Sequence, residues 1–292
     1  MSFIASSDQI AAFKQRCANP SYSQDAIGVE FTTTTEFISS VLPPTLEPAD
    51  KPTGLISVSL CQSNVCGSFE LSSISVRCRC DGVEGYWVLH LIVSESAAIT
   101  WGRETWGEVK RDGKARLHSC GTLKSAFAER LGVRLIEIEA DFTTPLEPEQ
   151  VEWFDFEVKA FPNAQGTGLD ADPNLIALKV VDSNNVRASG KGRLTIRGTQ
   201  SDPLHTIPIK AVGDFFYNSG PSDWMFVSQR RLCSADEYMP YYVFRHYGNL
   251  VDLLVGVGLN PIQMAGELEE GLQFTRARTW VSANTEESDR TL

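Results

Sequence analysis

Runs of apolar residues of strand length dominate the hydrophobic pattern of this chain. Leu55–Leu60, Tyr86–Val93 and Leu175–Val181 are such runs, whereas Arg134–Glu139 and Asp155–Ala160 alternate between apolar and charged residues. Alternation with a period of two is typical of a strand with one solvated face. Strands separated by turns rather than by regular helices favour a mainly β (α+β) fold with a largely antiparallel sheet.

Helix signals are fewer. Helices are predicted over Asp8–Cys17, Thr34–Val41 and Thr122–Leu131. The third is followed by Gly132, which suits the C′ position of a helix. Ser234 and Glu237 form a Ser-x-x-Glu capping box, which predicts the start of a further helix. We expect one domain over residues 1–235 and a helical C-terminal extension, 236–292, that packs on it as a cap, a subunit contact or a lid over the pocket.

The charge balance excludes several partners. The chain has 292 residues and a formal net charge of -11, which argues against binding to nucleic acid or to an anionic membrane. No apolar run reaches membrane-spanning length. Seven cysteines without a secretory signal predict reduced thiols in a cytoplasmic protein. The spacing of Cys61, Cys66, Cys78 and Cys80 fits buried sheet positions better than a zinc site. We expect no metal.

A local excess of positive charge runs against this acidic background. Between Trp101 and Arg134 lie eight basic and four acidic residues, and Lys110 is directly followed by Arg111. A solvated basic face is one interpretation. The other is chemical: a fixed cation beside a partly desolvated lysine disfavours the ammonium form, and a neutral amine attacks ketones to form a Schiff base.

The residues around this pair resemble a known family. The run Ala98–Glu104 contains Gly-Arg-Glu, and five residues later comes Lys110-Arg111. This is similar to the signature of the acetoacetate decarboxylase family, in which Gly-Arg-Glu is followed after five residues by Lys-Lys. Val41–Glu47 and Gly82–Tyr86 resemble further family segments. The resemblance covers about residues 25–235, and it implies an antiparallel β barrel or cone with few helices, no cofactor and a homo-oligomer.

The resemblance also implies roles for individual residues. Lys110 matches the Schiff-base lysine, Arg111 takes the place of the second lysine, and Glu70 matches one active-site glutamate. Glu108 lies two residues before Lys110, so on an extended segment both side chains face one pocket, where Glu108 moves protons. Simple pairing of Glu108 with a neighbouring base is the alternative. Nearby aromatic residues suit a bulky, apolar substrate or, alternatively, belong to the core: Phe69, Trp87 and Trp106.

The sequence also departs from the family. It has no acid near Gly54–Ile56, where the family has its other glutamate, and Ser23-Gln24-Asp25 replaces an upstream arginine. We therefore expect a cofactor-independent lyase that decarboxylates a β-keto acid larger than acetoacetate through a Schiff base. A Schiff-base aldolase, dehydratase or cyclase acting on a keto substrate, and a catalytically silent binder of small ligands, are the alternatives.

Overall fold

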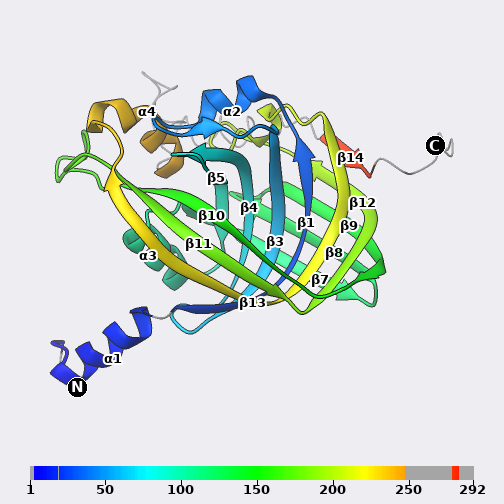
Figure 1. Ribbon diagram of the computed structural model, residues 1–292, viewed down its shortest axis with the longest axis horizontal. Helices are drawn as coiled ribbons and strands as arrows, with labels where there is room; N and C mark the ends of the chain where they lie inside the picture. Colours follow the sequence, from blue (N-terminus) through cyan, green and yellow to red (C-terminus); the bar gives the residue numbers. More distant parts are fainter. Residues whose placement is uncertain (1–2, 19, 247–277, 283–292) are drawn as a thin grey trace.

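The computed structural model describes residues 3–18, 20–246 and 278–282, and its strands form one highly curved sheet (Figure 1). The helices are α1 (Ser7–Ala18), α2 (Thr35–Val41), α3 (Ser96–Thr105) and α4 (Ala235–His246), with a 3-10 turn η1 (Leu204–Thr206). The strands are β1 (Ser21–Thr32), β2 (Glu47–Pro48), β3 (Thr53–Ser63), β4 (Gly67–Cys80), β5 (Val83–Val93), β6 (Lys110–Asp112), β7 (Lys114–Cys120), β8 (Leu123–Arg130), β9 (Val133–Leu146), β10 (Glu149–Lys159), β11 (Asn174–Asn184), β12 (Val186–Ile196), β13 (Ala211–Arg231) and β14 (Arg278–Val281).

Seven of these strands close into a barrel. Their order is β1-β3-β4-β5-β10-β11-β13, and the barrel closes because β13 also pairs with β1, for example Ile27 with Tyr217. Neighbours are antiparallel except β5 and β10, which run parallel where Phe156 lies beside Trp87. The predicted mainly β barrel with few helices is confirmed.

The remaining long strands build a second layer. From β13 the sheet continues through β12, β9, β8 and β7, and β7 and β8 pack against the outer face of β3 and β4. The main hydrophobic core lies between these two layers, since residues of both are fully buried there. The barrel contributes Ile56, Val58, Ile74 and Val76, and the second layer contributes Ala128, Ile136, Ile138 and Leu194.

The predicted helix over Thr122–Leu131 is wrong, because this segment forms strand β8. Its Ala126 and Ala128 are both buried, as residues two apart on one face of a strand would be. Leu131 and Gly132 have φ angles of 49° and 80° and connect Arg130 to Val133 as a two-residue hairpin turn. The glycine therefore ends a strand rather than a helix.

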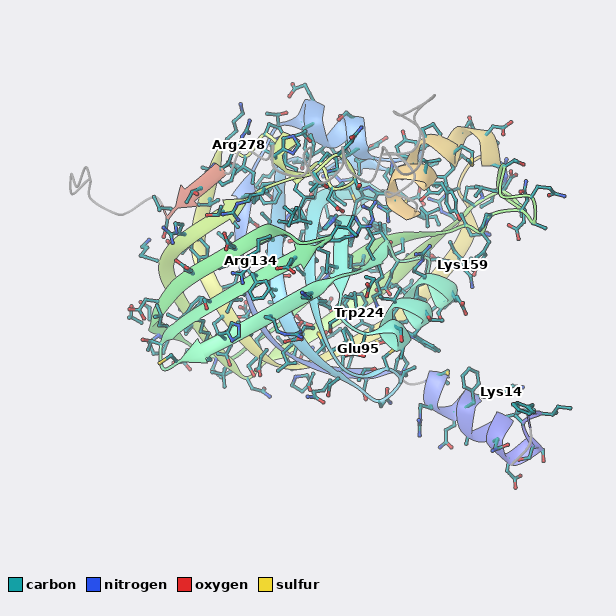
Figure 2. The ribbon with its side chains drawn as sticks, turned by 180° about the vertical axis from the view of Figure 1, so that it is seen from behind. Lys14, Glu95, Arg134, Lys159, Trp224 and Arg278 are labelled. Carbon is teal, nitrogen blue, oxygen red and sulfur yellow. The ribbon has the colours of Figure 1, made fainter. Side chains whose placement is uncertain are left out.

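The other helix predictions agree with the structure. Helix α1 has no buried residue and projects from the barrel, as Figure 2 shows around Lys14. Thr34 caps α2. Ser234 and Glu237 form the expected capping box at the start of α4. The extension predicted over 236–292 is described only in part: α4 is helical, residues 278–281 form a strand on β12, and 247–277 and 283–292 lie outside the described residues. The domain boundary stays a prediction.

Candidate active site

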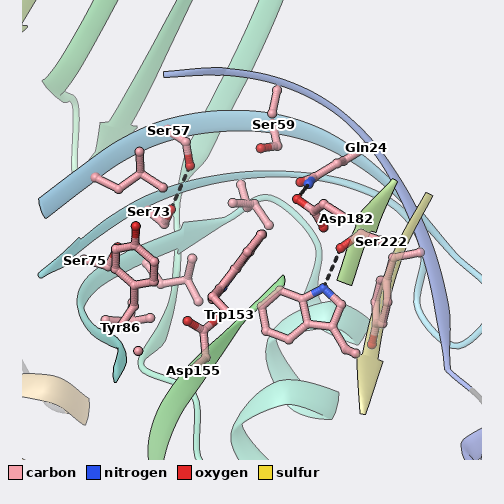
Figure 3. A pocket seen from close by; sticks show the side chains of 18 of the residues that line it. Gln24, Ser57, Ser59, Ser73, Ser75, Tyr86, Trp153, Asp155, Asp182 and Ser222 are labelled. Atoms are coloured by element: carbon pink, nitrogen blue, oxygen red, sulfur yellow. Dashed lines mark hydrogen bonds between the residues drawn. The ribbon is translucent and has the colours of Figure 1, made fainter. Parts of the chain in front are cut away.

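The inside of the barrel holds a cavity of about 650 Å³. Side chains from every strand of the barrel line it, and Figure 3 shows part of this lining. The loop that follows α3 adds Trp106 and Glu108. Pockets for small molecules have volumes of roughly 300–1,000 Å³. The cavity is therefore large enough for a ligand much bigger than a four-carbon keto acid.

Lys110 lines this cavity. It is the first residue of β6, which pairs in parallel with β5 and sets Lys110 beside Leu91. The side chain is buried, its Nζ is 2.7 Å from Glu108 Oε2, and the same Nζ lies 5.7 Å from the centre of the Phe69 ring. The structure thus brings together Lys110, Glu108 and Phe69, as the residue spacing suggested for the first two.

Gly102 of α3 gives this pair its space. A Cβ at this position would lie 2.6 Å from Lys110 Nζ and would overlap Glu108 Oε2. The carbonyl oxygen of Gly102 also accepts hydrogen bonds from the amides of Trp106, Gly107 and Glu108. The glycine of the Gly-Arg-Glu motif therefore has a local physical role, because its missing side chain admits the two charged groups and its carbonyl fixes the loop that carries Glu108.

Two more carboxyl groups enter the cavity from β10. Asp155 and Glu157 are both buried, and Arg245 of α4 donates a 3.0 Å hydrogen bond to Glu157 Oε2. Burial first, and then the charge of Glu108, raise the pKa of Asp155 from its ordinary value of 3.8 to about 7. Burial also raises the pKa of Glu157 well above its ordinary value. Asp155 is therefore suited to carry a proton near neutral pH.

Asp182 of β11 adds a further acid on the wall of the cavity (Figure 3). Gln24 of β1 donates a 2.8 Å hydrogen bond from Nε2 to Asp182 Oδ2. Burial raises the pKa of Asp182 to about 6, although hydrogen bonds from Ser222 and Gln24 lower it. Gln24 belongs to the segment Ser23-Gln24-Asp25, in which the sequence analysis noted the lack of an upstream arginine. This wall accordingly carries an amide and an acid rather than a cation.

Arg111 lies on the other side of the sheet. Successive residues of a strand point to opposite faces, and Arg111 lines a different cavity of about 400 Å³ together with His90 and Trp87. Its Nη1 donates 2.9 Å hydrogen bonds to Asp202 Oδ1 and to the carbonyl oxygen of Ser201. Arg111, predicted to take the place of the family's second lysine, and Trp87, predicted to contact substrate, therefore both lie outside the barrel cavity.

Glu70 also faces away from the barrel interior. It pairs with Arg116 of β7, while its neighbour Phe69 faces the cavity. Trp106, predicted to contact substrate, does line the cavity and stacks on Trp224, with ring centres 6.1 Å apart. Of the seven residues proposed from the sequence, four therefore lie at the cavity: Lys110, Glu108, Phe69 and Trp106.

The sequence analysis missed Asp155, Glu157 and Asp182. A signal for the first two was present, since both belong to the charged face of the alternating segment Asp155–Ala160. That face was interpreted as exposed to bulk solvent. In a closed barrel it faces the interior instead.

The described residues contain no cluster of metal ligands. Among them, no three His, Cys, Asp or Glu side chains lie close enough together to hold a metal ion. All seven cysteines are free, and Cys61 lies on the cavity wall. Across the same residues, no helix combines the length and the apolar character needed to cross a membrane.

Comparison with solved structures finds the same fold in several enzymes. An acetoacetate decarboxylase from Legionella pneumophila superposes with a TM-score of 0.64 at 18% identity, over 74% of this chain and 88% of that one. The enduracididine biosynthesis enzyme MppR, complexed with the condensation product of pyruvate and imidazole 4-carboxaldehyde, gives 0.59 at 15% identity, over 73% and 89%. An acetoacetate decarboxylase-like enzyme from Sphingomonas wittichii RW1 gives 0.58 at 14% identity, over 74% and 94%.

No curated protein sequence matches this chain. A family model does, and its description is acetoacetate decarboxylase (ADC). The match spans residues 3–220, which includes the Gly102–Lys110 segment, the buried acids of β10 and the whole of β11. The chain therefore belongs to the acetoacetate decarboxylase family, as a divergent member.

Proposed function

We propose that this protein is a cofactor-independent lyase that forms a Schiff base between Lys110 and a keto substrate. The observation that carries the proposal is the buried pair of Lys110 Nζ and Glu108 Oε2, 2.7 Å apart on the wall of a large cavity. A lysine becomes a nucleophile when it gives up a proton to a nearby base in a desolvated site. Glu108 is placed to take that proton.

The chemistry follows from this geometry. The neutral amine of Lys110 adds to the ketone, and Glu108 returns the proton to the resulting hydroxyl group, which leaves as water and gives an iminium ion. The iminium accepts the electron pair of a bond at the adjacent carbon. In a β-keto acid this is the bond to the carboxylate, so carbon dioxide leaves and an enamine remains. A proton from a buried carboxyl group, such as Asp155, then reaches the carbon, and water releases the product.

Decarboxylation of a β-keto acid larger than acetoacetate is the first reaction we propose, supported by the family and by the size of the cavity. A second reaction, an aldol-type, dehydration or cyclisation step, has support from the scarcity of cations on the wall. The described lining residues include six acids, and Arg77 is the one cation besides Lys110 that could hold the carboxylate of a β-keto acid: Glu84, Glu108, Glu152, Asp155, Glu157 and Asp182, against Arg77 and Lys110. MppR, which shares the fold, has been seen with a condensation product of pyruvate.

Borohydride trapping tests the proposal. The protein is incubated with acetoacetate, 3-oxooctanoate or pyruvate, reduced, digested and analysed by mass spectrometry. We expect an adduct on the peptide that contains Lys110 and none in Lys110→Gln. Lys114→Gln is the matched control, since its side chain is exposed and pairs with Glu129. Full turnover by Lys110→Gln, or no adduct with any ketone, would overturn the proposal, and ligand binding without an adduct would favour a silent binder.

Carbon dioxide release then distinguishes the two reactions. An adduct accompanied by carbon dioxide from 3-oxooctanoate supports decarboxylation. An adduct with pyruvate that condenses with an added aldehyde, without carbon dioxide from any keto acid, supports the aldol-type reaction instead.

A further inference from the structure

The barrel cavity continues beyond Lys110, across β5, β4 and β3. In the register Lys110 lies beside Leu91, Leu91 beside Ser73, and Ser73 beside Ser57. At about 4.8 Å between neighbouring strands, this path is about 14 Å long. A four-carbon keto acid anchored on Lys110 would fill only part of it.

The chemistry of the wall changes across the sheet. On β5, the strand beside Lys110, the lining includes the apolar residues Val88 and Leu91. On β4 and β3, at the same register, it is rich in hydroxyl groups. We call the four serines of this stretch the serine arm: Ser57, Ser59, Ser73 and Ser75.

The serine arm occupies positions that normally hold apolar side chains. Ser57 and Ser73 are directly opposite each other in the register, with their Oγ atoms 2.9 Å apart (Figure 3). Ser59 and Ser75 are 2% and 6% exposed. Placing buried hydroxyl groups on the inner face of a sheet is costly unless something satisfies them. Their presence indicates that this part of the cavity is built for polar contents.

Strands β11 and β13 add further polar groups to the cavity. Asn184, Asn218 and Ser222 are neutral donors and acceptors, and Ser222 Oγ accepts a 2.9 Å hydrogen bond from Trp224 Nε1. The charged side chains of this region are acids rather than cations, namely Asp155 and Asp182. Flat aromatic side chains lie between the polar groups, among them Tyr86 and Trp153 (Figure 3). Neutral hydrogen-bonding groups interleaved with aromatic faces suit an uncharged chain that carries several oxygen atoms.

We infer that the serine arm is a subsite for an uncharged, oxygen-bearing tail of the keto substrate. The substrate class is then an elongated ketone with several hydroxyl, ether or carbonyl oxygens, in contrast to a short keto acid or a fatty keto acid. This inference rests on the proposed function, because Lys110 holds the ketone end. Each hydrogen bond between the tail and the arm contributes roughly 2- to 10-fold in affinity.

Two methyl ketones of equal length test the inference. One is 2-undecanone and the other carries an ether-oxygen tail of the oligo(ethylene glycol) type. The measured quantity is the ketone concentration that gives half-maximal borohydride trapping on Lys110. We expect this concentration to be at least tenfold lower for the oxygen-bearing ketone. In Ser57→Val/Ser73→Val the ratio of the two concentrations should fall to about one.

Ser68→Val is the matched control, since Ser68 lies on the same strand but is exposed and bonds Gln62. It should keep the wild-type ratio. Equal trapping of both ketones by the wild type, or an equal loss of preference in Ser68→Val, would overturn the inference. Thermal melting of each variant shows whether it is folded.

Failure of the Schiff-base proposal gives a different result, namely no trapping of acetone or of either ketone on Lys110. The subsite is then tested without a covalent step, by calorimetry with the alcohols that correspond to the two ketones. Tighter binding of the oxygen-bearing alcohol, lost in Ser57→Val/Ser73→Val, supports the subsite. Equal binding of both alcohols overturns it.

Discussion

The two faces of β3 and β4 have opposite chemistry. Toward the second layer these strands present Ile56 and Ile74, which are fully buried in the main core. Toward the barrel interior they present four serines, among apolar residues such as Phe69 and Leu71, around a cavity of about 650 Å³. The same stretch of backbone therefore supports a close-packed core on one side and a polar, incompletely filled site on the other.

One face of each strand therefore contributes mainly to stability and the other mainly to function. Burial of apolar side chains between the layers stabilises the fold. The inner face can then carry ionisable and polar groups that contribute little to the free energy of unfolding. Charge follows the same division: Asp155 inside the barrel has a raised pKa, whereas hydrogen bonds and cations around Asp202, outside the barrel, hold its pKa below the usual range despite burial.

The largest effect should come from Asp202→Asn, outside the barrel. This carboxylate accepts hydrogen bonds from Arg111, Arg130 and His90, at 2.9, 2.6 and 2.9 Å. A neutral amide does not compensate the buried guanidinium groups, so we expect a loss of about 3–5 kcal/mol in the free energy of unfolding. Urea unfolding measures it, with Asp214→Asn in an exposed pair as control. If the loss is no larger than that of Asp214→Asn, Asp202 does not compensate the buried guanidinium groups.

Ile74→Ala and Leu71→Ala compare the two faces of β4 directly. Ile74 lies in the main core and Leu71 on the cavity wall. We expect Ile74→Ala to reduce the free energy of unfolding by about 3 kcal/mol, because it leaves a void in a packed core. Leu71→Ala borders space that is already open, so its cost should stay below about 1 kcal/mol. Equal losses in urea unfolding would show that the interior is packed as tightly as the core.

Gly102→Ala should affect catalysis far more than stability. The new methyl group would displace Glu108 and Lys110, whose flexible ends can move aside. We expect kcat/KM to fall at least tenfold, which corresponds to about 1.4 kcal/mol of transition-state stabilisation. The free energy of unfolding should change by less than about 1 kcal/mol. Gly213→Ala, where the added Cβ has room, is the control. Unchanged kinetics would rule out this role for Gly102.

The last prediction concerns pH and Asp155. The native state keeps a proton on Asp155 up to about pH 7, whereas the unfolded chain releases it near pH 4. The raised pKa therefore makes the native state less stable as pH rises from 4 to 7. Asp155→Asn removes this contribution, so the variant should gain about 2.7 kcal/mol relative to wild type at pH 8 compared with pH 5. Urea unfolding at both pH values measures the free energy of unfolding. If this free energy changes equally between pH 5 and pH 8 in the variant and in the wild type, the pKa of Asp155 is not raised.

Several elements were predictable because their signals are local. The strands around Leu55–Leu60 and Leu175–Val181 follow from apolar runs, and α2 and α4 follow from their caps. Thr122–Leu131 was mistaken for a helix because alanine, lysine and glutamate favour helices locally. Packing against the second layer decides otherwise, since Ala126 and Ala128 are buried on one face of β8.

The sequence alone determined the family, the mainly β class and the pairing of Lys110 with Glu108. These features depend on motifs and on residues two apart, which the chain places locally. The same parity sends Arg111 and Glu70 to the opposite faces of their strands. Only closure of the barrel could bring Asp155 and Asp182 to one cavity, because pairing between distant strands decides which faces meet. Tertiary structure therefore decided what surrounds the lysine and how much space a substrate has.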